Sequence, residues 1–242
     1  RWRIGIDASG YYYFKCNSKF MKYNKSDTLF ELTTSSPSKF VAFSAEERNL
    51  PPALFGVEFR AETNTTMNYV VKISSGYSNS RITTKSIEDA VDNWMMYLED
   101  YKPKIYMCDD APADIRESAC VITIKNMGPN DDGLGLTEFN DANGNRILNT
   151  YDGSIVTSIT IKFAHDTTLT QTEINNVVMH ELGHAMGLAH PHHCGYADYT
   201  INNQEIWTVL ALLNQKLFNT APLSSAMPSG FDLWNLGKKW GN

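Results

Sequence analysis

Apolar and polar residues alternate in the first part of the chain, and this is the period of a β-strand with one buried face. The alternation or a short aromatic run occurs in four segments: 2–6, 11–14, 40–43 and 55–59. Pro51-Pro52 and the Ser/Thr-rich residues 33–38 separate them as loops. We therefore expect residues 1–65 to form a small β-rich region, which is a separate subdomain, an extension packed on a larger core, or a retained pro-segment.

A helical period begins after a strand-like segment at 69–73 and a loop at 74–80. Apolar residues spaced three or four positions apart form one stripe, as on a helix with one buried side. Its members are Ile87, Ala90, Val91, Trp94, Met95 and Leu98. Ser86 with Asp89 three residues later fits a capping box. The pattern predicts a helix over residues 87–100.

Further strands and helices follow along the chain. Strand-like apolar patterns occur in four segments: 104–108, 120–125, 133–139 and 159–164. Helical spacing occurs after Thr170, at 203–218 and at 231–241. Thr170 with Glu173 fits a second capping box, at the start of the first of these helices.

Residues 141–145 allow two interpretations. Asp141, Asn143 and Asn145 match the first ligand positions of an EF-hand calcium loop, but Arg146 stands where that loop has glycine. No glutamate follows at the twelfth position of the loop. Asn143-Gly144 is a strong signal for a two-residue hairpin turn. We favour the turn and keep Ca²⁺ as the alternative.

Composition narrows the class of protein. The chain has 242 residues, 42% of them hydrophobic and 20% charged, as in an ordinary globular protein. Its formal net charge of −6 argues against general nucleic-acid binding, which needs a basic surface. No apolar run reaches the length of a membrane span, and no signal peptide is visible in the first residues.

The four cysteines are Cys16, Cys108, Cys120 and Cys194. None belongs to a C-x-x-C pair, so we expect no structural zinc site built from thiolates. An even number is compatible with two disulfides and an oxidising compartment, which favours a secreted or extracellular protein. Four cysteines allow three pairings, and we favour Cys108–Cys120, which would close a short loop, together with Cys16–Cys194.

A cluster of histidines gives the strongest chemical signal of the chain. A helix turns about 100° per residue, so His180 and His184 share one helix face and can bind one metal ion. Glu181 lies beside them and can reach a metal-bound water. Gly187 suits the end of the helix, beyond which the chain can turn back and deliver His190 as a third ligand. Three nitrogens and an open position are what catalytic zinc needs, and a surface helix with chance histidines is the weaker interpretation.

This H-E-x-x-H-x-x-G-x-x-H motif resembles the zinc-binding signature of the metzincin clan of metalloendopeptidases. The strand, loop and helix from about residue 66 onward resemble the start of a matrixin catalytic domain. The resemblance implies an α+β fold over residues 66–242, with a twisted mixed β-sheet, an active-site helix and a C-terminal helix. It divides this domain into an upper subdomain, to about residue 187, and a lower subdomain, 188–242.

Two further segments carry the resemblance. Residues 224–230 resemble the methionine turn of the clan, which would place Met227 beneath the three histidines. Residues 133–139 resemble the edge strand above the active-site cleft, although an ordinary hairpin strand is the alternative. In that edge strand the substrate backbone would pair as an added strand with Leu134, Gly135 and Leu136.

The resemblance implies a zinc-dependent endopeptidase with one catalytic Zn²⁺. In such an enzyme Glu181 acts as the general base on a metal-bound water, which attacks the scissile carbonyl. We expect protein or peptide substrates, no nucleic acid, no membrane span and a monomer. Two alternatives stay open: a latent form covered by residues 1–65, and a zinc-bearing adhesion or toxin-type binding module. Cys16 does not stand in the cysteine-switch sequence of matrixin zymogens, so we favour a disulfide for it.

Overall fold

The computed structural model describes the secondary structure of residues 3–6, 12–24, 29–35, 37–38, 54, 56, 58–59, 68–98, 103–150, 153–165, 168–190, 200–201, 204–205, 228 and 230–240. The chain forms two compact units, Arg1–Leu50 with Pro222–Ser224, and Pro51–Ala221 with Ser225–Asn242. Compactness does not by itself define an independently folding domain, so the boundary predicted at residue 65 remains a prediction.

The first unit contains a four-stranded antiparallel sheet in the order β1-β2-β3-β4. Its strands are β1 (Arg3–Ile6), β2 (Tyr12–Cys16), β3 (Lys19–Asn24) and β4 (Leu29–Thr33). The β-rich character predicted for this region is confirmed. We predicted neither β3 nor β4, and Thr33, which we assigned to a loop, ends β4. In β3, Phe20 and Met21 are apolar neighbours on opposite faces and break the alternation. The strand predicted at 40–43 lies outside the described residues.

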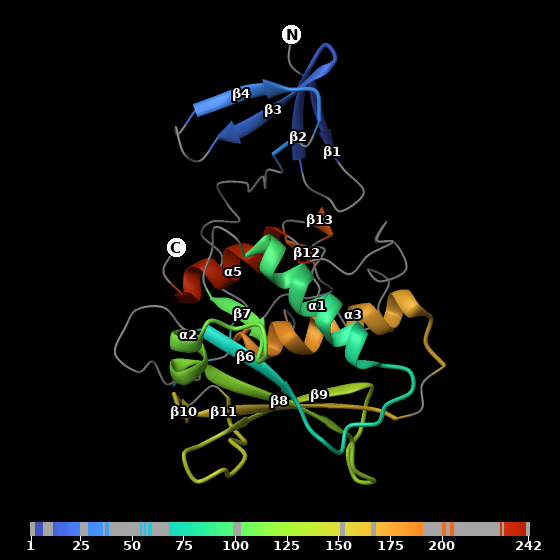
Figure 1. Cartoon of the computed structure of the whole chain (residues 1–242), viewed down its shortest axis with the longest axis vertical. Coiled ribbons are helices and arrows are strands. Elements are labelled where there is room, and N and C mark those ends of the chain that lie inside the picture. The colour runs from blue at the N-terminus through green and yellow to red at the C-terminus, as the bar shows by residue number, and fades with distance from the viewer. Residues whose placement is uncertain are drawn as a thin grey trace. The chain divides into compact units, whose positions relative to one another are not determined.

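The second unit is built on a five-stranded mixed sheet in the order β7-β6-β8-β11-β9 (Figure 1). The parallel strands are β6 (Asn68–Ile73), β7 (Lys104–Met107), β8 (Cys120–Asn126) and β11 (Ser158–Phe163). β9 (Gly135–Asn140) runs antiparallel to β11 and forms one edge of the sheet. The predicted α+β class with a mixed sheet is confirmed, as is the edge position of β9.

Helices pack on this sheet because one of its faces is almost wholly apolar. The register places Val71, Ile122 and Ile159 side by side on that face, and all three are at most 1% exposed. α3 (Gln171–Ala185) contacts β9 and β11, and α1 (Thr84–Tyr97) contacts β7 and α3. Three short elements belong to the same unit: α2 (Ala113–Ser118), which contacts β6, and β5 (Glu58–Phe59) and β10 (Ile155–Val156), which pair in parallel.

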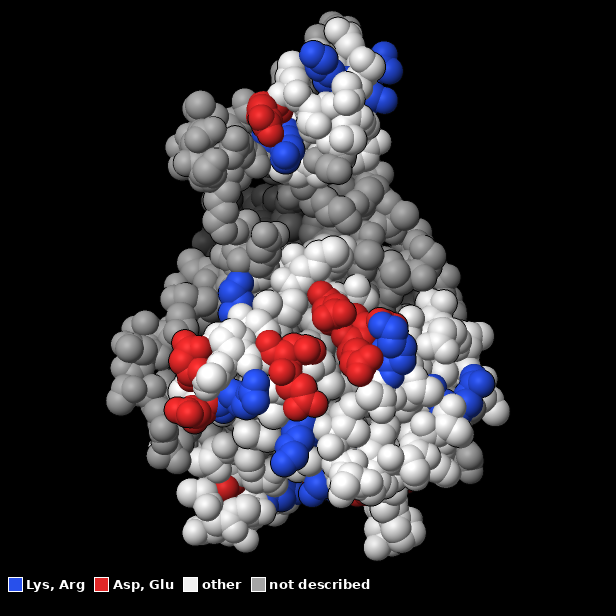
Figure 2. Space-filling model, viewed as in Figure 1, with Lys and Arg blue, Asp and Glu red and all other residues white. Residues whose placement is uncertain are grey.

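The start of α1 corrects one prediction. Thr83 is the N-cap, and its side chain accepts a hydrogen bond from the backbone N–H of Ser86. The capping box predicted at Ser86 and Asp89 is wrong, because Ser86 already lies in the first turn and Asp89 pairs with Lys85. The predicted apolar stripe of α1 is buried except at Met95, which is half-buried. Its outward side is charged, and Figure 2 shows acidic side chains gathered on one face of the larger unit.

The predicted disulfides are also wrong, since Cys16, Cys108 and Cys120 are free thiols. Cys108 follows the end of β7, and Cys120 begins β8. β6 lies between these strands, so they are about 10 Å apart, whereas bridged cysteines have Cα atoms within about 7 Å. Cys194 lies outside the described residues. The secreted location therefore loses this support and remains a prediction.

The C-terminal part is described only in pieces. β12 (Thr200–Ile201) pairs with β13 (Gln204–Glu205), so the helix predicted at 203–218 does not begin where we expected, and its remainder lies outside the described residues. α5 (Gly230–Trp240) confirms the C-terminal helix, with Leu233 and Leu236 buried. Among the helices that the structure describes, none is long and apolar enough to cross a membrane.

Candidate metal centre

α3 is fixed at both ends of the segment that carries two of the histidines. The predicted capping box starts the helix: Thr170 and Glu173 exchange side-chain and backbone hydrogen bonds. The indole N–H of Trp94, on α1, donates to the carbonyl of Met179 at 3.1 Å. The indole N–H of Trp240, on α5, donates to the carbonyl of Met186 at 3.1 Å. Two helices from distant parts of the chain, α1 and α5, thus bond the backbone just before His180 and just after His184.

The chain reverses at Gly187, directly after α3. Gly187 has φ 103°, a left-handed conformation that disfavours any side chain with a Cβ. The N–H of Leu188 donates back to the carbonyl of Gly183 at 3.1 Å, which closes the helix end. Leu188 also forms an antiparallel bridge with Leu54, from the segment before the sheet. This turn brings His190 back toward the helix.

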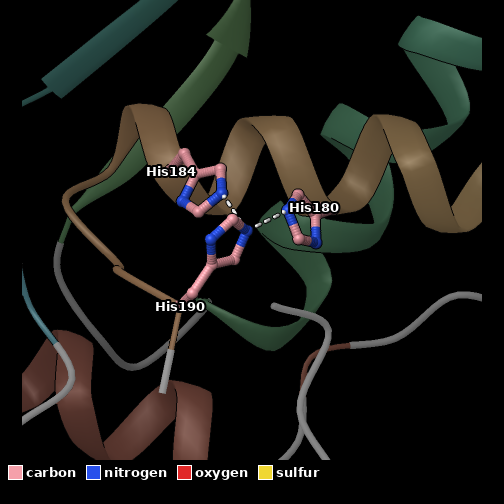
Figure 3. A group of neighbouring side chains, drawn as sticks. All are labelled: His180, His184 and His190. Carbon is pink, nitrogen blue, oxygen red and sulfur yellow. Dashed lines mark hydrogen bonds between the residues drawn. The ribbon is translucent and has the colours of Figure 1, made fainter. Parts of the chain in front are cut away.

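Three imidazoles converge at this point, two from α3 and one from the returning chain (Figure 3). Nε2 of His190 lies 2.9 Å from Nε2 of His180 and 3.0 Å from Nε2 of His184. All three donor atoms lie within 4.8 Å of one another. Lone pairs of neutral imidazoles that face one another this closely repel unless a proton or a cation lies between them.

The hydrogen bond of His184 indicates which of its two ring nitrogens can bind a metal ion. Its Nδ1 lies 2.7 Å from the carbonyl oxygen of Leu188, and only a protonated nitrogen can donate to that oxygen. Nε2 then keeps its lone pair and points to the other two imidazoles. An outer hydrogen bond of this kind is the usual way in which a protein orients a histidine ligand.

Glu181 lies beside this cluster and is 6% exposed. Burial raises the pKa of its carboxyl to about 7, although a hydrogen bond from Thr137 lowers it in part. That bond joins the Thr137 hydroxyl to Oε2 of Glu181 at 2.7 Å. The carboxyl can therefore be charged or neutral near neutral pH.

These residues fit a divalent transition metal. Neutral imidazole nitrogens suit zinc, copper, iron and nickel, so the donor set is consistent with zinc without identifying it. At residues 141–145 the carboxylate of Asp141 bonds the backbone of its own loop. Oδ1 of Asp141 accepts hydrogen bonds from the backbone N–H groups of Asn143 and Asn145. A turn forms here, but not the two-residue Asn143-Gly144 turn: the N–H of Gly144 donates to the carbonyl of Asp141 at 3.0 Å, so Ala142 and Asn143 are the central residues and Gly144, with φ 78°, follows them.

The structure brings together the three predicted histidines, Glu181 follows His180 on α3, and Gly135 on β9 lies against the side chain of Glu181. The structure says nothing of Met227, which lies outside the described residues. Sequence reasoning missed Thr137, Trp240 and the carbonyl of Leu188. Only the alternation of β9 could have indicated Thr137, because it shares a strand face with Gly135.

No protein-family model matches the chain, and no curated protein sequence matches it. The class of the protein is therefore described from its structure alone. It is an α+β protein with a group of three histidines that could hold a metal ion.

Proposed function

We propose that the protein is a zinc-dependent endopeptidase of the metzincin type, with a matrixin-like catalytic domain. One observation carries the proposal. The three histidine Nε2 atoms converge, and the residue after His180, Glu181, has a buried carboxyl group that is bonded to the edge strand β9 through Thr137. A site that only stores or transports a metal does not require such a carboxyl group.

His180, His184 and His190 would hold the metal through Nε2. When bound, zinc would lower the pKa of a water molecule and polarise a carbonyl group. Glu181 would take the proton from that water on its carboxylate and later pass it to the leaving amine. Thr137 would keep the carboxylate in place during both transfers.

β9 would bind the substrate backbone. The carbonyl of Leu134 accepts from Ala164 on the β11 side at 3.0 Å, whereas the carbonyl of Phe139 accepts from Ile147 at 2.8 Å on the other side. Backbone groups alternate in direction along a strand, so those of Gly135 and Thr137 point to the outer edge. An extended peptide could pair with them as an added strand. Of the three residues predicted to bind substrate, only Gly135 presents its backbone to that edge.

Replacing Glu181 by Gln tests the proposal. The amide keeps the shape but cannot accept the proton, so peptide hydrolysis should fall by roughly 10²–10⁴-fold while zinc stays bound. Hydrolysis of a peptide library by the zinc-loaded chain, together with metal analysis of both proteins, measures this. Equal hydrolysis by parent and variant would refute the mechanism. A parent chain that binds zinc and cleaves nothing would favour the binding-module alternative.

A further inference from the structure

Two alternate residues of β9, Gly135 and Thr137, face Glu181 across the space between sheet and helix. The hydroxyl of Thr137 lies 2.7 Å from Oε2 of Glu181 and 3.1 Å from its backbone carbonyl oxygen. The hydroxyl has one hydrogen, and the shorter distance to a carboxylate oxygen favours Oε2 as its acceptor. Oε2 is thereby tied to the strand, and Oε1 is the oxygen without this bond.

Gly135 leaves the space that the carboxyl group occupies. A Cβ at this position would lie 2.6 Å from both Cγ and Oε1 of Glu181, far inside van der Waals contact. The backbone of Gly135 is not left-handed, so its conformation would accept another residue. Glycine is required here by the close approach of Glu181 and not by the geometry of the strand.

We infer that Gly135 and Thr137 are positioning residues that together fix the carboxylate of Glu181 for catalysis. The inference rests on the proposed function, since it concerns the general base of that site. Thr137 holds one oxygen by a hydrogen bond, and Gly135 admits the side chain on its other side. Thr137 acts only through Glu181, and Gly135 has no side chain, so both are positioning residues and not catalytic ones.

The same two residues present their backbone groups to the outer edge of the sheet. A peptide that paired with β9 would therefore bind to the residues that hold the base. Substrate binding would stiffen this strand and, through Thr137, the position of Glu181. Misplacement of a catalytic group by about 1 Å can cost about 10²-fold in rate. Loss of the bond from Thr137 to Glu181 should therefore lower the rate by a measurable amount.

The test compares Thr137→Val, which has the same shape without the hydroxyl, with Thr137→Ser, which keeps it. Thr160→Val is the matched control, because Thr160 lies on β11 opposite Glu138 and faces away from Glu181. The readouts are kcat and KM for a peptide, zinc content, and crystal structures of the full chains. We expect Thr137→Val to lose about tenfold to 10²-fold in kcat, the scale of a misplaced catalytic group, with unchanged KM and zinc content.

In the crystal structure of Thr137→Val the Glu181 carboxylate should leave its position, whereas Thr137→Ser and Thr160→Val should keep both position and rate. If Thr137→Val does not fold, Gly135→Ala provides the same test, because its Cβ must displace Glu181. An unmoved carboxylate with unchanged kcat in the variant would overturn the inference. If the parent protein cleaves no peptide but the Glu181 carboxylate moves in Thr137→Val, the positioning role of Thr137 is supported. The proposed endopeptidase function is then refuted.

Discussion

His184 uses its two ring nitrogens for two different partners. Nδ1 donates to the carbonyl of Leu188, and Nε2 faces the other imidazoles. The carbonyl belongs to the turn that returns His190 to the helix. Orientation of one candidate ligand thus depends on the segment that carries another.

Loss of one imidazole should therefore remove the metal. In His184→Ala, two donors remain and the contact to Leu188 is lost, so bound zinc should fall well below one ion per chain after dialysis. His165→Ala is the control, because His165 is exposed and outside the group. Elemental analysis of the two proteins measures the difference. Full zinc content in His184→Ala would exclude it as a ligand.

Cys120 should be inert in the native protein. Burial raises the pKa of its thiol to about 12 from an ordinary value of 9.0, so the reactive thiolate is scarce. At pH 8.5 iodoacetamide should label the less buried Cys16 and Cys108 and leave Cys120 unlabelled until the chain is denatured. Peptide mapping by mass spectrometry shows which thiols react. Rapid native labelling of Cys120 would contradict its burial.

The same thiol should make stability depend on alkaline pH. Between about pH 9 and pH 12 the unfolded chain releases the Cys120 proton while the folded chain keeps it. The unfolded state then binds fewer protons, so the free energy of unfolding falls as pH rises, by up to about 1.4 kcal/mol per pH unit. Cys120→Ala should show a shallower decline in denaturant titrations over this range.

At the scale of elements, the capping box of α3 supports the helix that carries His180 and His184. Thr170→Ala removes the side chain that accepts from Glu173 N–H, which should cost about 1 kcal/mol. The melting temperature should fall by about 2–4 °C, as for a domain of this size. Thr168→Ala, at an exposed position outside the helix, is the control. Equal melting of both variants would show that the cap is not needed.

Strands with one clear apolar pattern could be predicted from the sequence, and the order of the strands could not. The sequence places Cys108 and Cys120 close along the chain, but β6, which comes earlier, lies between their strands. Order in a sheet depends on crossover connections and not on local pattern. The helix prediction was wrong at Gln204–Glu205 for another reason. The helical spacing of apolar residues lies further along the chain, and we extended the helix back from it over these two residues.

At the scale of the whole molecule, the site depends on contacts between distant segments. The histidine spacing is local and could be predicted. The indole contacts of Trp94 and Trp240 with α3 join residues 85 and 54 positions apart, and no local pattern indicates them. The bridge between Leu54 and Leu188 is longer still. Such pairs are fixed only when the helices and the sheet pack together.

Truncation should distinguish the two units. Residues 54 and 58–59 pair with Leu188 and with β10, so they belong to the unit that holds the histidines. A chain that lacks residues 1–50 should keep its zinc, whereas one that lacks residues 1–65 should bind zinc more weakly and melt at a lower temperature. Metal titration and calorimetry measure both effects. Equal zinc affinity of the two truncated chains would show that the bridge is dispensable.

The outer edge of β9 has a consequence for handling the protein. Pairing through Gly135 and Thr137 uses backbone groups, which every polypeptide has, including other copies of this chain. An active preparation would therefore digest itself, at a rate that rises with concentration and in segments that lack regular structure. The Glu181→Gln protein would stay intact on storage, and its comparison with the parent needs no added substrate.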